Sequence, residues 1–221
     1  MHKKGSVLIA AGLLLLAASL MLTCYNVWDA HRADVAAQTA VQSLKIMIPA
    51  ETAPGIQSAP AETQPQLEGT EPREESRETT VAPGAIDGHR EMPTVELDGY
   101  QYIGVLDVES VELSLPVMDR WDYDRLKISP CRFAGNVYQD NLVICAHNYA
   151  QHFTPLKYVP IGTEVKFTDA EGNVFRYAVS SIDTVGPNDV ERMIYGDWDL
   201  TLFTCNTNGQ TRCAVRCDRI Q

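Results

Sequence analysis

Aromatic residues are missing from a long central part of this sequence. None occurs between Trp28 and Tyr100, whereas most of the phenylalanine, tyrosine and tryptophan residues lie beyond residue 100. A packed core needs large apolar side chains, so their absence excludes a compact domain from the middle of the chain. The folded part is therefore predicted in residues 100–221.

The sequence also lacks any block of basic residues. It has 18 Lys and Arg against 29 Asp and Glu, for a formal net charge of -11, and much of the acidic excess lies between Glu51 and Glu96. Nucleic-acid binding needs Lys and Arg concentrated on one surface to neutralise phosphates. Nucleic acid is therefore not an expected partner.

Charged side chains are absent from residues 5–28, an apolar run that follows Lys3 and Lys4. At about 1.5 Å rise per residue this run crosses a hydrocarbon core about 30 Å thick. It does not end in the small residues that precede signal-peptide cleavage, so an uncleaved anchor in residues 1–28 is favoured over a cleaved signal. The two lysines predict a cytoplasmic N-terminus with the rest of the chain outside the cell.

Two segments connect the anchor to the folded part. In residues 29–48, apolar residues from Ala37 to Ile48 recur at helical spacing, which predicts a short amphipathic juxtamembrane helix. Residues 49–99 are rich in Pro, Glu, Thr and Ala, and they predict a disordered stalk. Such a stalk would hold a domain above the membrane, inside a thick cell envelope.

Short β-rich segments alternate with turn residues beyond residue 100. Strands are predicted at residues 102–108, 113–117, 141–146, 164–168, 174–184, 200–204 and 211–220. Brief helical turns are predicted at residues 151–159 and 189–195. The fold class is therefore all-β, and an antiparallel sheet closed into a barrel is the most economical architecture.

Two of the five histidines, His147 and His152, lie in the predicted folded part. His147 follows the apolar segment 142–146 and precedes the polar Asn148, which predicts a position where a strand emerges at the rim of the sheet. A substrate has access to an imidazole there. From position alone, a histidine that is simply hydrogen-bonded at a sheet edge is the commoner interpretation.

Cys205 lies at a comparable position, between the apolar segment 200–204 and the polar segment 206–210. A reactive cysteine needs exposure and a positive neighbourhood that favours the thiolate, and Arg212 and Arg216 follow in the next predicted strand. The alternative is a small buried hydrophobic residue, as most free cysteines are.

The remaining cysteines predict neither a nucleophile nor a metal site. Cys24 lies in the anchor, and the folded part holds an odd number: Cys131, Cys145, Cys205, Cys213 and Cys217. Cys213 and Cys217 would lie about 13 Å apart in an extended strand, which is too far for a disulfide. Their spacing does not fit zinc binding either. The other four cysteines of the folded part are therefore expected in the core or in occasional disulfides.

Taken together, the two strand ends resemble the sortase family. Residues 201–205 (TLFTC) match its TLxTC signature, His147 lies in the strand-end histidine position within CAHN, and Arg212 opens the last strand as the family arginine does. The resemblance covers residues 100–220, and the upstream anchor and stalk fit it as well. It favours the catalytic interpretation of Cys205 and His147.

The resemblance implies a closed eight-stranded β-barrel with short helices and the activity of a cell-surface cysteine transpeptidase. Such an enzyme cuts a C-terminal sorting signal, commonly LPxTG, on secreted proteins through a cysteine thioester. It then transfers the acyl group to an amine of a peptidoglycan precursor or of another acceptor. The implied roles are Cys205 as nucleophile, His147 as proton donor and acceptor, Arg212 as charge stabiliser, and Thr204 and Asn148 as support for the oxyanion or substrate.

The resemblance leaves the subclass open. The segment after His147 resembles class B, but the connection at residues 186–198 is too short for the long helical insert of that class. No apolar tail follows Gln221, which disfavours the pilus-assembling class. Housekeeping, class B-like and class D-like enzymes all fit.

No cofactor is expected. Four acidic residues resemble the calcium site of some members of the sortase family: Asp140, Asp183, Asp189 and Glu191. Scattered carboxylates are usually solvated surface groups, so calcium is not predicted.

Two alternatives to a transpeptidase stay open. A papain-like cysteine hydrolase normally has its nucleophile before its histidine and lacks the arginine, whereas the order here is His147, Cys205, Arg212. A non-catalytic, envelope-binding β-barrel would share the anchor, the stalk and the fold. The absence of a single fast-reacting thiol would identify that binding module.

Overall fold

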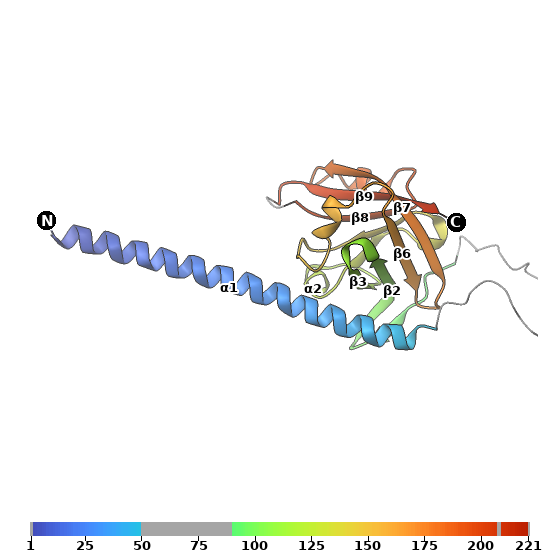
Figure 1. The fold of residues 1–221 in the computed structure, drawn as a ribbon, viewed down its shortest axis with the longest axis horizontal. Coiled ribbons are helices and arrows are strands. Elements are labelled where there is room, and N and C mark those ends of the chain that lie inside the picture. Colours follow the sequence, from blue (N-terminus) through green and yellow to red (C-terminus); the bar gives the residue numbers. More distant parts are fainter. Residues whose placement is uncertain (1, 50–89, 207–208, 221) are drawn as a thin grey trace, which may run out of the picture.

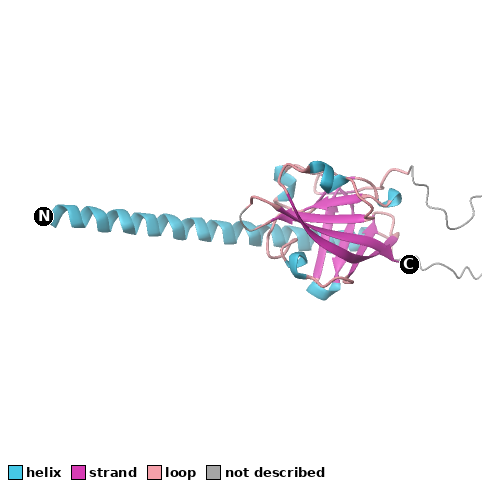
Figure 2. Cartoon of the chain, turned by 90° about the horizontal axis from the view of Figure 1, so that it is seen from above, coloured by secondary structure: helices cyan, strands magenta, loops and turns pink. Residues whose placement is uncertain are grey.

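The computed structural model describes residues 2–49, 90–206 and 209–220. A long helix, α1 (His2–Met47), extends from a β-rich domain, and only its C-terminal part lies against that domain (Figures 1 and 2). The strands are β1 (Val95–Leu97), β2 (Tyr100–Val108), β3 (Leu113–Met118), β4 (Cys131–Ala134), β5 (Leu142–Cys145), β6 (Glu164–Asp169), β7 (Val174–Val185), β8 (Leu200–Cys205) and β9 (Arg212–Ile220). The short helices are η1 (Glu109–Val111), α2 (Tyr123–Leu126), η2 (Val137–Gln139), η3 (Pro155–Tyr158) and α3 (Val190–Ile194).

Eight of these strands form a closed barrel. Their order is β2-β3-β4-β5-β8-β9-β7-β6, and the ring closes because β6 also pairs with β2. β1 lies outside the ring and pairs with the first residues of β2. The predicted closed eight-stranded barrel is confirmed. The expectation of a purely antiparallel sheet is wrong, because β5 runs parallel to β8 and β3 runs parallel to β4.

The predicted elements beyond residue 100 are all present, and the helical turns predicted at residues 151–159 and 189–195 appear as η3 and α3. β1, β4 and α2 were not predicted, because three or four residues are too few to show a periodic pattern. β1 lies within the predicted stalk at residues 49–99, and Met92 just before it is buried. The ordered domain therefore begins before residue 100. The rest of the predicted stalk, residues 50–89, lies outside the described residues.

Helix α1 runs without a break from the predicted anchor into the predicted juxtamembrane helix. The side chains of residues 7–28 are all exposed, and α1 is the one helix in the described parts of the chain with the length and composition of a membrane span. Beyond them an apolar stripe is buried: Ala33, Ala37, Ala40, Val41, Leu44 and Ile48. Most of this stripe packs against Tyr102, Val105 and Met118 on the outside of the barrel. The end of α1 is thus part of the domain.

The barrel interior is filled by apolar side chains that alternate along the strands, among them Leu106, Ile144 and Leu202. At the closure between β2 and β6 the two backbones approach closely. Gly104 has φ +155 there, and a Cβ atom at this position would lie 2.1 Å from the carbonyl oxygen of Thr168. Only glycine allows this approach, so Gly104 is required for the barrel to close.

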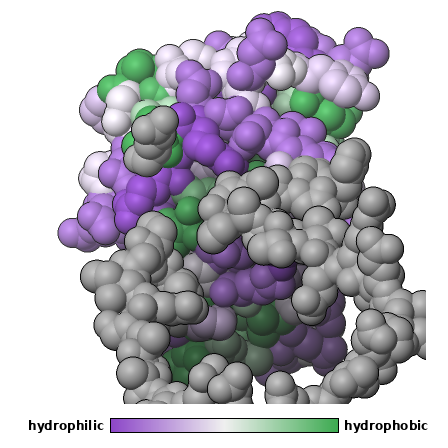
Figure 3. All heavy atoms as spheres, turned by 90° about the vertical axis from the view of Figure 1, so that its right-hand side faces the viewer, coloured by the Kyte–Doolittle hydropathy of each residue, from purple (hydrophilic) through white to green (hydrophobic). Residues whose placement is uncertain are grey.

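The side of the domain turned away from the N-terminus of α1 is largely hydrophilic where described residues are visible (Figure 3). Large apolar side chains are exposed elsewhere on the domain, among them Trp121, Tyr123 and Val190. These three residues line a pocket on the outside of the barrel.

Candidate active site

The ends of β8 and β9 bring Cys205 and Arg212 directly opposite each other. The next pair along is hydrogen-bonded, because the Asn206 N–H donates to the Thr211 carbonyl at 2.9 Å. Bonded and non-bonded pairs alternate in an antiparallel ladder, so Cys205 and Arg212 form a non-hydrogen-bonded pair, with Cα atoms about 4.5 Å apart and side chains on one face. Backbone register alone therefore makes the thiol and the guanidinium neighbours.

The Arg212 guanidinium is tied to the turn that joins the two strands. Its Nη1 donates to the carbonyl oxygens of Gly209 at 3.0 Å and Thr211 at 3.3 Å. Asn206 Nδ2 donates to the Thr211 hydroxyl at 2.7 Å and closes the base of the turn. Both of these bonds use Nη1, and among the described residues none accepts from Nε or Nη2, so these donors can serve a substrate.

Lys157 of η3 places a second cation at the same strand end. Its Nζ donates to the backbone carbonyl of Cys205 at 2.7 Å. The bond connects the end of β8 to the segment that follows His147. Sequence reasoning missed Lys157, because a lysine in a surface turn gives no signal of a partner 48 residues away.

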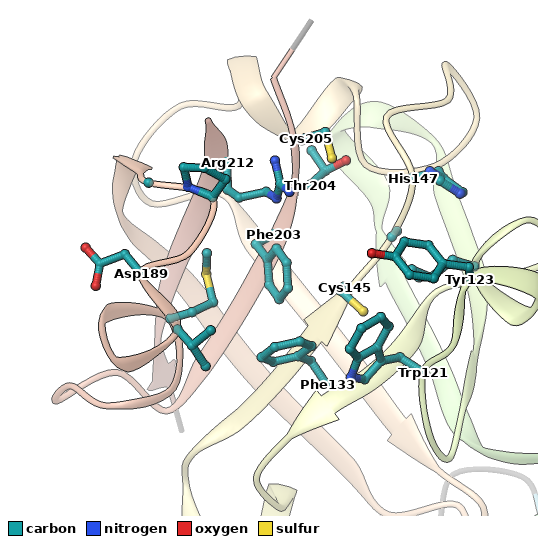
Figure 4. A pocket seen from close by; sticks show the side chains of 16 residues that line it. Trp121, Tyr123, Phe133, Cys145, His147, Asp189, Phe203, Thr204, Cys205 and Arg212 are labelled. Atoms are coloured by element: carbon teal, nitrogen blue, oxygen red, sulfur yellow. The ribbon is translucent and has the colours of Figure 1, made fainter. Parts of the chain in front are cut away.

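His147 follows β5, which lies on the other side of β8. The two strands are parallel, with Cys145 opposite Phe203. His147 follows two residues beyond this last pair, and it lines the same pocket as Cys205. In Figure 4, Cys205 lies between Arg212 and His147 along the top of the pocket. The fold thus brings the three predicted catalytic residues to one end of three neighbouring strands, and no hydrogen bond joins this thiol to this imidazole.

An apolar pocket of about 260 Å³ opens beside these residues (Figure 4). Its floor is aromatic: the rings of Phe133 and Phe203 meet edge to face at 5.1 Å between centroids, and Trp121 lies 5.5 Å from Phe133. Val190 and Met193 of α3 line it from the connection between β7 and β8. The reactive groups therefore stand at the rim of a site suited to apolar side chains.

The environment of His147 favours the neutral imidazole. Partial burial has the largest effect on the pKa of His147 and lowers it from its ordinary value of 6.5. The Asp29 carboxylate raises this pKa, and the Lys127 ammonium lowers it. The imidazolium is therefore the minor form at neutral pH.

Helix α1 contacts the loop that carries His147. The Tyr149 hydroxyl donates to Asp29 Oδ2 at 2.7 Å, and Asp29 Oδ1 accepts from Arg32 at 3.1 Å. Burial and the Asp29 carboxylate raise the pKa of Tyr149 to about 12, so its hydroxyl stays protonated and donates. Sequence reasoning missed both residues. The available signals were that Asp29 is the first charged residue after the apolar run and that Tyr149 lies two residues beyond His147.

The two predicted support residues differ in their placement. Thr204 lines the pocket beside Cys205 (Figure 4), and its buried hydroxyl has no hydrogen-bond partner in the described parts of the chain. Asn148 is exposed and is not among the residues that line the pocket, although its carbonyl accepts from the Thr154 hydroxyl at 2.6 Å. The structure therefore brings Thr204 to the site and leaves Asn148 outside it.

Arg216, the other arginine considered for the site, is a buried residue of the domain. Its side chain is 1% exposed and forms a salt bridge with Asp183 at 3.3 Å. The guanidinium also donates to the Thr201 hydroxyl at 3.0 Å and to the Arg192 carbonyl at 2.6 Å, and it lies 4.3 Å from the centroid of the Trp198 ring. These partners fix the connection between β7 and β8 to the barrel.

The remaining cysteines of the domain are buried free thiols, whereas Cys205 is partly exposed. Burial raises the pKa of Cys131 and of Cys217 to about 12, and it raises the pKa of Cys145 as well. These thiols are therefore poor nucleophiles. Among the described residues, no group of three or more His, Cys, Asp or Glu side chains is placed to hold a metal ion.

Comparison with known proteins identifies a family. The model of the sortase domain matches residues 106–220, more than half of the 221 residues. Sortase A from Corynebacterium diphtheriae is 22% identical with a TM-score of 0.51, over 55% of this chain and 62% of that chain. Sortase C1 of GBS Pilus Island 1 is 22% identical with a TM-score of 0.48, over 54% of this chain and 64% of that chain.

A sortase D5 transpeptidase from Clostridium perfringens is also 22% identical, with a TM-score of 0.48, over 54% of this chain and 79% of that chain. The present chain spans less than two thirds of the length of the sortase A and sortase C1 chains. No curated protein sequence matches it.

Proposed function

The chain belongs to the sortase family, and we propose that it is a membrane-anchored extracellular cysteine transpeptidase. Its proposed substrate is a C-terminal sorting signal of the LPxTG type on secreted proteins, and its acceptor is an amine of a peptidoglycan precursor or another amine. One observation carries this proposal: Cys205 lies opposite Arg212 and shares the rim of an apolar pocket with His147.

In the first half of the proposed reaction, the Cys205 thiolate attacks the carbonyl carbon of the threonine in the signal. The C–N bond breaks and a thioester remains on Cys205. The proton for the leaving amine comes from His147 in the minor fraction of molecules in which this residue is an imidazolium. Arg212 cannot lose its charge, and its position opposite Cys205 lets it donate to the oxyanion that forms next to the sulfur.

In the second half, an incoming amine attacks the thioester carbonyl. His147, now neutral, takes a proton from the amine, a new amide bond forms and Cys205 leaves as the thiolate. The thioester thus divides one difficult amide exchange into two easier steps. Atoms and charge balance without a cofactor.

The pocket supports a peptide substrate with apolar residues. Phe133, Phe203 and Met193 offer apolar contacts close to Cys205, whereas charged side chains of a substrate would find no partner on the aromatic floor. Exclusion of water by a bound peptide also favours attack by an amine over hydrolysis. The apolar residues of an LPxTG-like signal suit this site.

The membrane location rests on α1. Residues 5–28 carry no charged side chain, and Lys3 and Lys4 precede them. A cytoplasmic N-terminus puts the barrel and its pocket outside the cell, where secreted proteins and cell-wall precursors are found.

Product analysis tests the proposed function. Full-length protein in detergent is incubated with a panel of sorting-signal peptides, with and without candidate amines, and the products are identified by mass spectrometry. A transpeptidase produces the amide of the cleaved peptide with the added amine. Hydrolysis alone with every amine would identify a protease, and intact peptide with all signals would contradict the proposal.

A further inference from the structure

We propose that Asp29 of the anchor helix is a positioning residue for His147 and acts through Tyr149. The inference rests on the proposed function, because it concerns how the histidine is held for acyl transfer. It is based on a continuous series of contacts from α1 to the loop after β5.

Tyr149 is held at both ends. Its hydroxyl donates to Asp29 Oδ2 at 2.7 Å, and its ring lies 5.3 Å from the ring of His152, which is fully buried. The His147 ring lies 5.0 Å from the same tyrosine ring, at an interplanar angle of 34°. The tyrosine is thus a fixed surface against which the His147 imidazole rests.

The carboxylate that holds Tyr149 belongs to a rigidly docked helix. One helical turn beyond Asp29, Ala33 is 1% exposed, and Leu44 further along is completely buried against the barrel. Lys45 Nζ adds contacts to Asp107 at 3.3 Å and to the Ser114 hydroxyl at 3.0 Å. A group on such a support is held more precisely than a group on a loop.

The position of Asp29 along α1 relates this contact to the membrane. The uncharged run at residues 5–28 is about 36 Å long at about 1.5 Å per residue, which exceeds a hydrocarbon core of about 30 Å. Asp29 follows directly and therefore lies at headgroup depth. The contact with Tyr149 then holds the His147 loop, and the pocket beside it, close to the membrane surface. A domain that lacks α1 loses this contact.

Several charged or titratable groups surround His147, and two act in opposite directions. The Asp29 carboxylate raises the pKa of His147, whereas the Lys127 ammonium, which follows α2, lowers it. The charged or titratable groups near the imidazole are Asp29 with its partner Arg32 from α1, Lys127 after α2, Tyr149 and His152 from its own loop, and Tyr123 of α2 and Cys205 of β8, which line the same pocket. The Asp29 charge acts on His147 through space, so a shifted midpoint in Asp29→Asn shows that the carboxylate is close to the imidazole. The kcat of Tyr149→Phe, which keeps this charge and loses the hydrogen bond, shows whether the contact positions His147.

The test uses the full chain in phosphatidylcholine nanodiscs with ¹³C-labelled histidine. NMR titration follows the His147 resonance, which is assigned by its loss in His147→Gln. Asp29→Asn should move the His147 midpoint to lower pH, and Lys127→Gln should move it to higher pH. Asp34→Asn is the matched control, because it removes a carboxylate from the same helix without a hydrogen bond to the His147 loop, and the midpoint should not change.

Kinetics on a sorting peptide complete the test. In Asp29→Asn and Tyr149→Phe, kcat should fall by about tenfold, as expected when a contact of about 1.4 kcal/mol is lost in the transition state, with KM within about twofold of the wild type. A wild-type kcat and a wild-type His147 midpoint in Asp29→Asn would overturn the inference. A lower melting temperature with unchanged kcat and midpoint would also overturn it, since Asp29 would then only dock the helix.

The outcomes separate this inference from the proposed function. If neither the wild type nor any variant processes a sorting peptide, but the His147 midpoint moves as expected in Asp29→Asn and Lys127→Gln, the coupling to α1 holds and the transpeptidase proposal fails. The reverse result, an active enzyme with no response to either substitution, leaves the proposed function intact and refutes the coupling.

Discussion

Replacement of Arg212 by lysine should lower turnover without weakening the fold. The substitution keeps the positive charge opposite Cys205 but loses the planar fork of the guanidinium. If a transition-state contact of about 1.4 kcal/mol is lost, turnover falls by about tenfold or more. The hydrogen bonds of Arg212 go to the carbonyls of Gly209 and Thr211 in its own turn, so the free energy of unfolding should change by about 0.5 kcal/mol or less.

The same replacement at Arg216 should have the opposite effects. Arg216 is 1% exposed and has hydrogen-bond partners in Asp183, Thr201 and the Arg192 backbone, which one ammonium group cannot all satisfy. Loss of part of this buried network should cost about 3 kcal/mol, or roughly 9 °C in melting temperature. Turnover per folded molecule should change little, because Arg216 lies about 13 Å along the strand from Arg212.

Both variants are assayed on one sorting peptide at a temperature where each is folded, and thermal unfolding is followed by circular dichroism. Turnover is divided by the folded fraction before comparison. A larger corrected loss in Arg216→Lys than in Arg212→Lys would refute the assignment of Arg212 to the site. Equal melting temperatures of the two variants would contradict the structural role given to Arg216.

Three further predictions concern other parts of the chain. His147→Ala should abolish peptide cleavage and leave the circular dichroism spectrum unchanged, whereas Cys131→Ala should keep substantial turnover. Cleavage by His147→Ala at the wild-type rate would exclude His147 from the chemistry. Burial lowers the pKa of His152 from 6.5 to about 4, so the unfolded state binds its proton more readily. The contribution of His152 to the free energy of unfolding should be complete above about pH 6.5 and should decrease by about 3 kcal/mol as the pH falls to 4. Urea unfolding at pH 7 and pH 4.5 measures this decrease. An equal decrease in His152→Phe would show that another group is responsible. In cells, the protein should stay in the membrane fraction with its C-terminus cleaved by external protease, and recovery of a soluble form that begins near Asp29 would exclude the anchor.

Local patterns were sufficient to predict much of the barrel. The apolar segment 200–204 is followed by a polar turn, and its partner strand begins within a few residues, so β8 and β9 pair as an antiparallel hairpin. The parallel pairing of β5 with β8 depends instead on how the whole sheet closes, because β6 and β7 intervene in the chain. The apolar stripe from Ala37 to Ile48 predicted a helix, but the stripe contains no information about the strands that it covers.

The candidate site shows the same division between local and long-range contacts. The closeness of Cys205 and Arg212 follows from a short hairpin, and the TLFTC motif marked the cysteine. Lys157 contacts the Cys205 carbonyl from 48 residues away in the chain. The bond from Tyr149 to Asp29 spans 120 residues. Neither contact leaves a pattern in the sequence, because each arises from the packing of separate elements.

The thioester on Cys205 is the central claim of this account, and intact-protein mass spectrometry measures it most directly. The full-length protein is mixed with a sorting-signal peptide without added amine and is quenched in acid, which preserves thioesters. The wild type should gain the mass of the acyl fragment, a peptide map should place it on Cys205, and addition of the acceptor amine should remove it. Cys205→Ala should gain no mass, and an acyl adduct on that variant, or on another cysteine of the wild type, would contradict the account.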